Sequence, residues 1–513
     1  MIRSFVTVSS GTLASRLLGF ARDSMVAALL GAGPVADAFL VAFQLVNVVR
    51  RLLTEGALNA ALVPAWHRLR DTEGAAAAAA FAGKLLGTVS AALVAATALM
   101  ALAMPLVIAA LAPGFAGSEA LAMAVADARL MLPYLAFAGP VTVLMAVVNA
   151  QGRFALTAFS PLLFNIALIA VMAVLLLWRQ DATRAALILA AVVGIAGLLQ
   201  LLILILRRGD NAAAPLRISF DKDMRGFLAK AVPGMVASSG PQLLMIAAAI
   251  IASASPSAVS WLYFANRLIE LPLGLVGVAM GTVLVGELTH AVRSGDAAAV
   301  AHAESRALEL AAGLALPATL GLIVLAEPIV RLLFEHGAFT ASDTAATARA
   351  LVWLALGLPA QVLFKALAPA FFARENTATP LISVLKGIVF ALATAFLFGH
   401  FFGVEGVAAG VALGAWSSAL SLLREGATRF GFALDAAARR RLPRIVMAAL
   451  VMAAAIWFAL RFLPSAGLAQ AIALAALIAG SIAIYGLCLR LFGVTGWRET
   501  VNALKAGPRD LRG

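Results

Sequence analysis

Long apolar stretches of roughly 20 residues, the length that lets a helix cross the ~30 Å hydrocarbon core of a bilayer, recur along most of the chain. Short polar connections separate them. The pattern predicts fourteen membrane-spanning helices. Their expected ranges are 5–30, 37–62, 84–111, 124–149, 158–178, 185–206, 229–252, 259–287, 306–326, 345–372, 380–399, 404–423, 444–462 and 468–489.

Composition agrees with this pattern. The 513 residues are 63% hydrophobic and only 12% charged, whereas soluble domains carry about 25% charged residues. We therefore expect an all-α polytopic membrane protein. Arg16 and Arg22 interrupt the first apolar stretch, unlike the core of a cleavable signal peptide, so this stretch is expected to remain as the first membrane helix.

The distribution of charge predicts the orientation. With the N-terminus inside, basic residues concentrate in the inside connections, chiefly 207–230, 424–444 and the C-terminal tail. The outside connections carry only Arg179, Arg184, Arg331 and Arg461. The positive-inside rule then predicts that both termini are cytoplasmic. The net charge of +13 is accounted for by topology, and no nucleic-acid partner is expected.

The chain also contains an internal repeat. Residues 132–161 align with 351–380 at a constant offset of 219, and 105–115 resembles 328–339 at an offset of 223. The fourth predicted helix thus matches the tenth, so the repeating unit has six helices. An even-numbered unit keeps its orientation when repeated, which predicts two parallel six-helix halves around a central cavity, a transporter design.

The expected organisation follows from this repeat. The ranges are an N-terminal lobe at 1–206, a cytoplasmic linker at 207–228, a second lobe at 229–423, a basic cytoplasmic loop at 424–443, two additional helices at 444–489 and a cytoplasmic tail at 490–513.

Polar residues at helical spacing lie on one face of three predicted helices. The three stripes are Ser9, Thr12, Arg16, Gly19 and Asp23; Gln44, Asn47, Arg51 and Thr54; and Arg267, Glu270, Gly274, Gly277 and Gly281. Glycine stripes usually mark close helix packing. Arginines well inside a span are more informative, because each costs about 2.5–3.5 kcal/mol at the bilayer centre if it faces lipid.

These arginines are the candidate substrate-binding residues. The set is Arg16, Arg22, Arg50, Arg51 and Arg267, and the expected supporting residues of the cavity are Asp23, Asp37, Asn47, Glu55 and Glu270. Arg51 and Glu55 are at pairing distance along one helix, as are Arg267 and Glu270. Arg50 projects about 100° away from Arg51 around its helix. Because a guanidinium matches carboxylate and phosphate oxygens with a planar fork of donors, the set predicts an anionic, phosphorylated ligand.

Residues 15–64, SRLLGFARDSMVAALLGAGPVADAFLVAFQLVNVVRRLLTEGALNAALVP, resemble the N-terminal signature of the MurJ (MviN) family. The stretch 261–282 resembles that family's eighth helix, and 336–344 resembles its loop before the tenth helix. Members are lipid II flippases of the multidrug/oligosaccharidyl-lipid/polysaccharide (MOP) exporter superfamily. The resemblance covers all fourteen predicted helices.

The resemblance implies a function and assigns residues to it. The five arginines correspond to the family's cavity arginines, and Asp37 and Glu55 to its cavity acids. The implied substrate is undecaprenyl diphosphate bearing a disaccharide-pentapeptide, moved to the outer face by alternating access, with its lipid tail along helices 13 and 14. Cell-wall synthesis proteins are candidate partners. The sequence departs from the family pattern at Gln44, at Asn266 and in span 229–252, which lacks the acid of sodium-binding relatives.

Other functions explain the residues less well. Exporters of other polyprenyl-diphosphate-linked saccharides and drug antiporters of the same superfamily are the alternatives, although an antiporter favours membrane acids without neighbouring arginines. An enzyme is not expected: Asp221 and Asp223 are best explained as a helix cap, the five histidines have no metal-ligand spacing, and no phosphate-binding G-x-x-x-x-G-K-[ST] motif occurs. No cofactor, metal or nucleotide is predicted.

Overall fold

The computed structural model describes residues 2–494 except for short gaps at 55–56, 152–153, 208–215, 222–223, 230–231, 233–238, 295–296, 375, 433 and 465–466. Every regular element among the described residues is a helix, in agreement with the predicted fold class. The chain divides into two compact units, which are described separately: residues 1–260 with 336–340, and residues 261–335 with 341–513.

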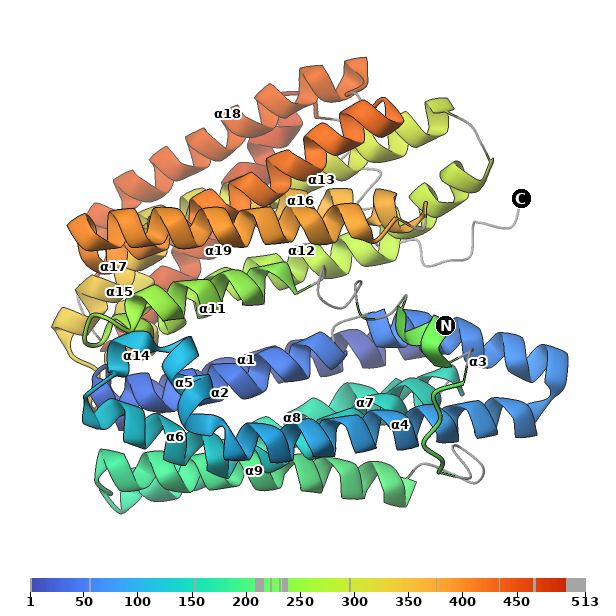
Figure 1. The fold of residues 1–513 in the computed structure, drawn as a ribbon. Coiled ribbons are helices and arrows are strands. Elements are labelled where there is room, and N and C mark those ends of the chain that lie inside the picture. The colour runs from blue at the N-terminus through green and yellow to red at the C-terminus, as the bar shows by residue number, and fades with distance from the viewer. Residues whose placement is uncertain are drawn as a thin grey trace. The chain divides into compact units, whose positions relative to one another are not determined.

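The first unit contains the helices up to α11 (Figure 1). Their bounds are α1 Ile2–Leu30, α2 Pro34–Thr54, α3 Ala57–Glu73, α4 Ala75–Leu102, α5 Met104–Leu111, η1 Pro113–Phe115, α6 Glu119–Met131, α7 Pro133–Ala150, α8 Phe154–Leu177, α9 Ala182–Arg207 and α11 Gly240–Ala252.

The second unit takes in most of α12 and the helices after it. Their bounds are α12 Ala258–Ser294, α13 Ala297–Val324, α14 Ala326–Phe334, α15 Ala341–Ala355, α16 Leu358–Phe372, α17 Ala378–Phe430, α18 Ala436–Ala459, η2 Leu460–Phe462 and α19 Gly467–Leu491.

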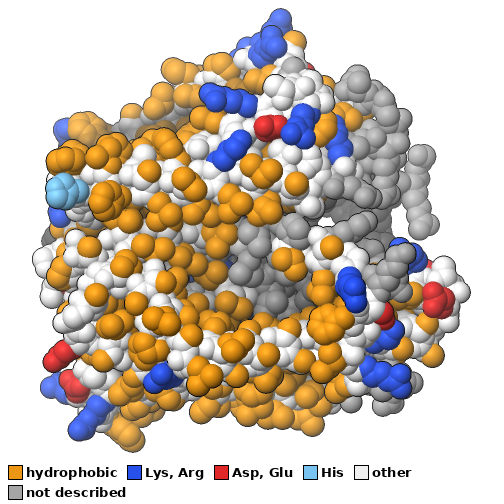
Figure 2. Space-filling model, viewed as in Figure 1, with side chains coloured by type: hydrophobic (Ala, Val, Ile, Leu, Met, Phe, Trp, Pro, Cys, Tyr) orange, Lys and Arg blue, Asp and Glu red, His pale blue; other side chains and the backbone are white. Residues whose placement is uncertain are grey.

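Eight helical segments in the described part of the chain are long and apolar enough to cross a membrane. They are 75–102, 119–150, 182–206, 299–324, 341–372, 378–430, 436–462 and 467–491. Segment 378–430 contains two predicted spans, separated by Gly403 with its positive φ of 58°. Figure 2 shows hydrophobic side chains over most of the visible flanks of the helices, with most charged side chains towards the helix ends. The total of fourteen stays a prediction.

Several predicted spans are divided into two helices, and proline residues explain the positions of the breaks. The range 84–111 is two helices, α4 and α5, and the ranges 124–149 and 345–372 are each divided as well. Pro105, Pro133 and Pro359 each occupy the first turn of the helix that follows the break. Proline has no N–H to donate and its ring crowds the preceding turn, so it starts a helix more readily than it continues one.

Two further ranges differ from expectation. The predicted span 37–62 corresponds to the end-to-end pair α2 and α3, and α3 continues to Glu73. The basic segment 424–443, expected to be a loop, is helical up to Phe430 and again from Ala436. Asp435 caps the second of these helices, because its Oδ1 accepts a hydrogen bond from the Ala438 N–H at 2.6 Å.

The order of helices reproduces the sequence repeat. The series α4–α5–α6–α7 runs from Ala75 to Ala150, and α13–α14–α15–α16 runs from Ala297 to Phe372, so both ends are displaced by 222 residues. Each series is a 28-residue helix, a short helix and a helix pair broken at its middle. α1 and α11, which end at Leu30 and Ala252, are displaced by the same number.

Within the first unit the ends of α1 and α11 each receive a tight turn from elsewhere in the chain. Beside α1, the Ala338 N–H donates to the Ala28 carbonyl at 2.8 Å, and a Cβ on Gly337 would lie only 2.3 Å from that oxygen. Beside α11, the Gly114 N–H donates to Ser253 Oγ at 3.0 Å, and a Cβ on Gly114 would again lie 2.3 Å from backbone. Only glycine permits approaches this close.

An extended segment, residues 216–221, lies along α4. The Thr88 hydroxyl bonds both the N–H and the carbonyl of Ser219, and Lys84 Nζ lies 2.9 Å from Asp221 Oδ2. Asp221 Oδ1 accepts from the Met224 N–H at 2.9 Å, which confirms the expected helix cap for Asp221, while Asp223 lies outside the described residues. The hydrogen bond from Lys84, then those from Met224 and Ser219, hold the pKa of Asp221 at about 2, below its ordinary 3.8.

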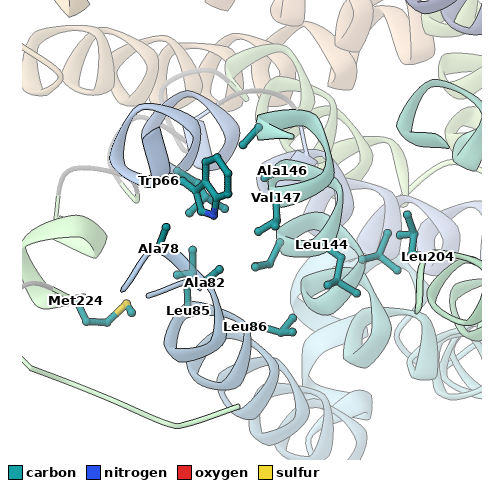
Figure 3. Packing of buried hydrophobic residues seen from close by; sticks show 14 residues of the cluster. Trp66, Ala78, Ala82, Leu85, Leu86, Leu144, Ala146, Val147, Leu204 and Met224 are labelled. Atoms are coloured by element: carbon teal, nitrogen blue, oxygen red, sulfur yellow. The ribbon is translucent and has the colours of Figure 1, made fainter. Parts of the chain in front are cut away.

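Met224 then enters a hydrophobic cluster built by α3, α4, α7 and α9 (Figure 3). Trp66, Leu85 and Leu144 belong to this cluster, and Phe227 stacks edge-on against Phe81 beside it. The chain that follows α9 is therefore fastened to α4 by polar contacts at residues 216–221 and by apolar packing just after them.

We expect Asp221→Asn to loosen this attachment, because it removes the partner of Lys84 and weakens the cap. Hydrogen exchange at the amides of Ser219 and Met224 should become faster than in the parent protein. Since the folded pKa is depressed, the difference should be full above pH about 4, the unfolded value, and should disappear as the pH falls towards 2. Asp71→Asn, at an exposed position of α3, is the control. Equal exchange in parent and Asp221→Asn at pH 7 would contradict this role.

Candidate functional site

Arg22, on α1, is held by four surrounding side chains. Only 6% of the residue is exposed. Its guanidinium contacts Asp23 Oδ1 at 2.6 and 2.9 Å and Asn165 Oδ1 on α8 at 3.2 Å. The rings of Phe43 and Phe164 lie 5.0 and 5.8 Å from its guanidinium carbon. This arginine is neutralised by Asp23 and enclosed by aromatic rings, an arrangement that fixes α1 against α2 and α8.

Asp37, near the start of α2, caps another helix. The residue is 1% exposed, and its two carboxylate oxygens accept from the N–H groups of Ser257 and Ser260, each at 2.8 Å. The Ser260 hydroxyl donates to Oδ1 as well. The first N–H groups of a helix have no partner within it. An acid of α2 therefore satisfies the beginning of α12, more than 200 residues further along the chain.

The two adjacent arginines of α2 are held differently. Arg50 approaches the Asn47 amide oxygen at 3.4 Å with both Nε and Nη2. Arg51 Nη1 lies 2.9 Å from the amide oxygen of Gln242 on α11, with that amide oriented for hydrogen bonding. Both arginines are half-buried. An amide oxygen accepts a hydrogen bond without neutralising the guanidinium, so neither of these contacts removes the positive charge.

The candidate residues of the second unit form one cluster on α12. Arg267 Nη1 lies 2.7 Å from Glu270 Oε2, which agrees with the pairing expected from their spacing. The Asn266 amide donates to the other oxygen of Glu270 at 3.4 Å. Glu270 is therefore shared by two neighbours, and the asparagine that departs from the family pattern supports the acid that holds Arg267.

The remaining candidates are placed as follows. Arg16 is half-buried on α1, and Asp23 is fully buried beside Arg22. Glu55 lies outside the described residues, so its pairing with Arg51 stays a prediction. Within the described ranges no group of three or more His, Cys, Asp or Glu side chains is placed to hold a metal ion.

Sequence reasoning missed the partners of these residues. Asn165, Gln242 and Ser260 lie on other helices, and no helical spacing links them to the arginines or to Asp37. A usable signal exists for Asn165, which is an isolated polar residue within the apolar run LLFNIALIA (162–170). Such a residue inside a membrane helix needs a polar partner.

Comparison with known proteins identifies relatives over nearly the whole chain. A family model described as "Lipid II flippase MurJ" matches residues 26–489. The probable lipid II flippase MurJ of Rhizobium meliloti (strain 1021) is 37% identical over 498 residues, covering 94% of this chain and 92% of its own. The lipid II flippase MurJ of Burkholderia cenocepacia is 33% identical over 471 residues, covering 90% and 91%.

Solved structures show the same fold. One described as "Lipid II flippase MurJ, inward closed conformation" superposes with a TM-score of 0.76 at 22% identity, covering 97% of this chain and all of the other. An inward-facing multidrug resistance MATE family transporter of the MOP superfamily superposes with a TM-score of 0.67 at 16% identity and covers 86% of this chain.

Asp37→Ala should destabilise the protein, because it leaves the Ser257 and Ser260 N–H groups without their acceptor. Losing a buried acceptor of this kind costs about 1–3 kcal/mol. Ser260→Ala removes only the hydroxyl bond and should cost less. Thermal unfolding of the purified protein in detergent, with Asp71→Asn as a surface control, measures both effects. Parent-like unfolding of Asp37→Ala would show that the cap contributes nothing.

Proposed function

The chain belongs to the lipid II flippase MurJ family, and on that premise we propose that it carries lipid II from the cytoplasmic to the periplasmic face of the inner membrane, with both termini in the cytoplasm. It is a multi-pass membrane transporter, not an enzyme. The family match across residues 26–489 carries this conclusion. The chemistry of the arginines supports it independently.

Arg16, Arg50, Arg51 and Arg267 are the groups we assign to the diphosphate. All four are half-buried rather than enclosed. The amide oxygens that hold Arg50 and Arg51 can be exchanged for phosphate oxygens, which are charged and make stronger hydrogen bonds to a guanidinium. Arg22 is a positioning residue, because Asp23 and two aromatic rings already occupy its surroundings.

Alternating access is the transport mechanism we propose. The arginines bind the diphosphate from the cytoplasm, the conformation changes, and the head group is released outside. A cytoplasm-negative potential favours outward movement of an anion by about 2.3 kcal/mol per charge per 100 mV. A drug antiporter of the same superfamily is less favoured, since arginines held by amides attract anions rather than cationic drugs.

The two additional helices, α18 and α19, are assigned to the lipid tail. Their inner faces are fastened to α13, where Arg441 Nη1 contacts Glu309 at 3.2 Å and the Tyr485 hydroxyl donates to the Gly313 carbonyl at 2.8 Å. Their outer faces leave large apolar side chains exposed, among them Trp457, Phe458 and Ile482. Such a surface suits an acyl or polyprenyl chain.

Reconstitution tests the function directly. The purified protein is incorporated into liposomes with labelled lipid II, and the fraction accessible to an external reagent is followed with time. Faster equilibration than in protein-free liposomes is the expected result. If the accessibility of labelled lipid II does not change and the protein instead exchanges a drug for a cation, the antiporter is favoured.

Replacing individual arginines should separate binding from positioning. Arg50→Ala and Arg267→Ala should abolish transport with near-normal protein in the membrane, and lysine should restore only part of it because it lacks the bidentate fork. Arg22→Ala should also lower the amount of folded protein, since it leaves Asp23 buried without its partner, at a cost of about 3–5 kcal/mol. Growth of a depleted strain and membrane immunoblots are the measurements, and the exposed Arg68→Ala is the control. Normal transport by Arg50→Ala and Arg267→Ala would remove both from the binding set.

Cysteine labelling tests the orientation. The native Cys488 is buried, so it contributes little background. Cysteines placed at Ser118 and Ser255, which are exposed, should react with a membrane-impermeant maleimide from outside, whereas one at Thr72 should react only after the membrane is opened. Labelling of Thr72→Cys in intact cells would contradict the predicted orientation and the direction of transport proposed from it.

A further inference from the structure

Asp127 on α6 is a buried acid that the transport mechanism does not yet use. It is 2% exposed, and its Oδ1 has no hydrogen-bond partner among the described residues. Three other interior acids are each held by a neighbouring side chain through at least one carboxylate oxygen: Asp23 contacts Arg22, Asp37 accepts from Ser260, and Asp343 accepts from Trp261 Nε1.

An ionised carboxylate in this position is not tenable. Moving an unpaired charge out of water costs far more than losing a single hydrogen bond, and a buried acid responds by keeping its proton. Burial therefore favours the neutral carboxylic acid form of Asp127 in this conformation. Only a conformation that brings water or a positive group to it allows ionisation.

Among the described side chains of the helices around α6, none is recorded in contact with the Asp127 carboxyl group. α6 packs against α2, α5, α7, η1 and α9. The ionisable residues on α6 and these helices are Glu119, Arg129, Asp37, Arg50, Arg51, Tyr134, Arg184 and Arg207. Asp37 caps α12. Arg50 contacts Asn47, and Arg51 contacts Gln242. The Tyr134 hydroxyl donates to Gln200, and Arg129 donates to the Ala101 carbonyl. Glu119 and Arg184 lie exposed near the starts of α6 and α9, and Arg207 is the last residue of α9.

We propose that Asp127 is a proton-binding site of the first unit, loaded when α6 is packed against α2 and α9 and unloaded when that packing opens. On opening, the O–H bond of the carboxylic acid breaks, the proton passes to water, and the carboxylate remains on α6. Reclosing requires the carboxylate to take up a proton again. The ligand of this site is thus a proton. Its occupancy depends on the packing of α6 against α2, the helix that carries Arg50 and Arg51.

The link to transport rests on the proposed function, but proton binding itself does not. A carrier that has released its anionic cargo must return, and a carboxyl group that has to be neutral in one conformation makes this return sensitive to pH. The side of the membrane from which the proton is taken then contributes to the direction of the cycle.

Infrared difference spectroscopy and transport, measured on the full-length protein, test the two parts separately. On titration in detergent, the parent should show the C=O stretch of a protonated carboxylic acid at neutral pH, and Asp127→Asn should lack it. In liposomes the parent transport rate should change by up to about tenfold per pH unit on the limb where this group titrates, and Asp127→Asn should be insensitive there. Glu119→Gln, an exposed acid on the same helix, should keep the parental behaviour in both measurements.

The outcomes distinguish the proposals. If Asp127→Asn keeps the carboxylic-acid band, or keeps the parental pH dependence of transport, Asp127 is not the proton site. If the parent transports no lipid II at all but Asp127→Asn loses the band, the proposed function fails and the proton site stands. Asp127→Glu retains an acid and should restore a pH-dependent rate, which a purely structural role of the side chain would not require.

Discussion

An ionised side chain within the hydrocarbon layer has no bulk water, so its partner must come from the protein itself. This constraint determines which helices are fastened together. Arg22 joins α1 to α8 through Asn165, and Asp37 joins α2 to the beginning of α12. The partners differ in kind: Arg22 contacts the buried Asp23 and is enclosed by aromatic rings, whereas Arg50 and Arg51 contact amide oxygens, which do not neutralise a guanidinium.

The sequence predicted the groups that need partners better than the partners themselves. Three-and-four spacing located the arginines of α1, α2 and α12 and the Arg267–Glu270 pair, since both members lie on one helix. Asn165 lies 143 residues from Arg22, and Ser260 lies 223 from Asp37, so no local rule connects them. The apolar length of a segment likewise did not reveal where it breaks. Pro133 and Pro359 end one helix and begin another without changing the hydropathy.

The repeat explains why those breaks occur where they do. Both series, α4 to α7 and α13 to α16, contain a long helix, a short one and a helix pair started by proline. The glycine turns at Gly114 and Gly337 belong to corresponding places in the two series, and they rest on the ends of α11 and α1. Each turn therefore contacts the helix that precedes the other series. These contacts join the early part of one repeat to the middle of the other. Glycine is the only residue small enough for the close approach at each of the two turns.

A repeated backbone does not oblige the two copies to carry the same chemistry. Along α15, Arg349 is paired with Glu405 at 2.6 Å and is largely exposed, whereas α6, the helix in the corresponding place, carries the buried Asp127. A paired, exposed arginine keeps its charge in every conformation. An enclosed carboxylic acid becomes charged only when its surroundings open to water or to a positive group. The first unit thus combines arginines that contact amide oxygens with a group whose ionisation depends on helix packing. A change in packing then alters the net charge of the unit that carries Arg50 and Arg51.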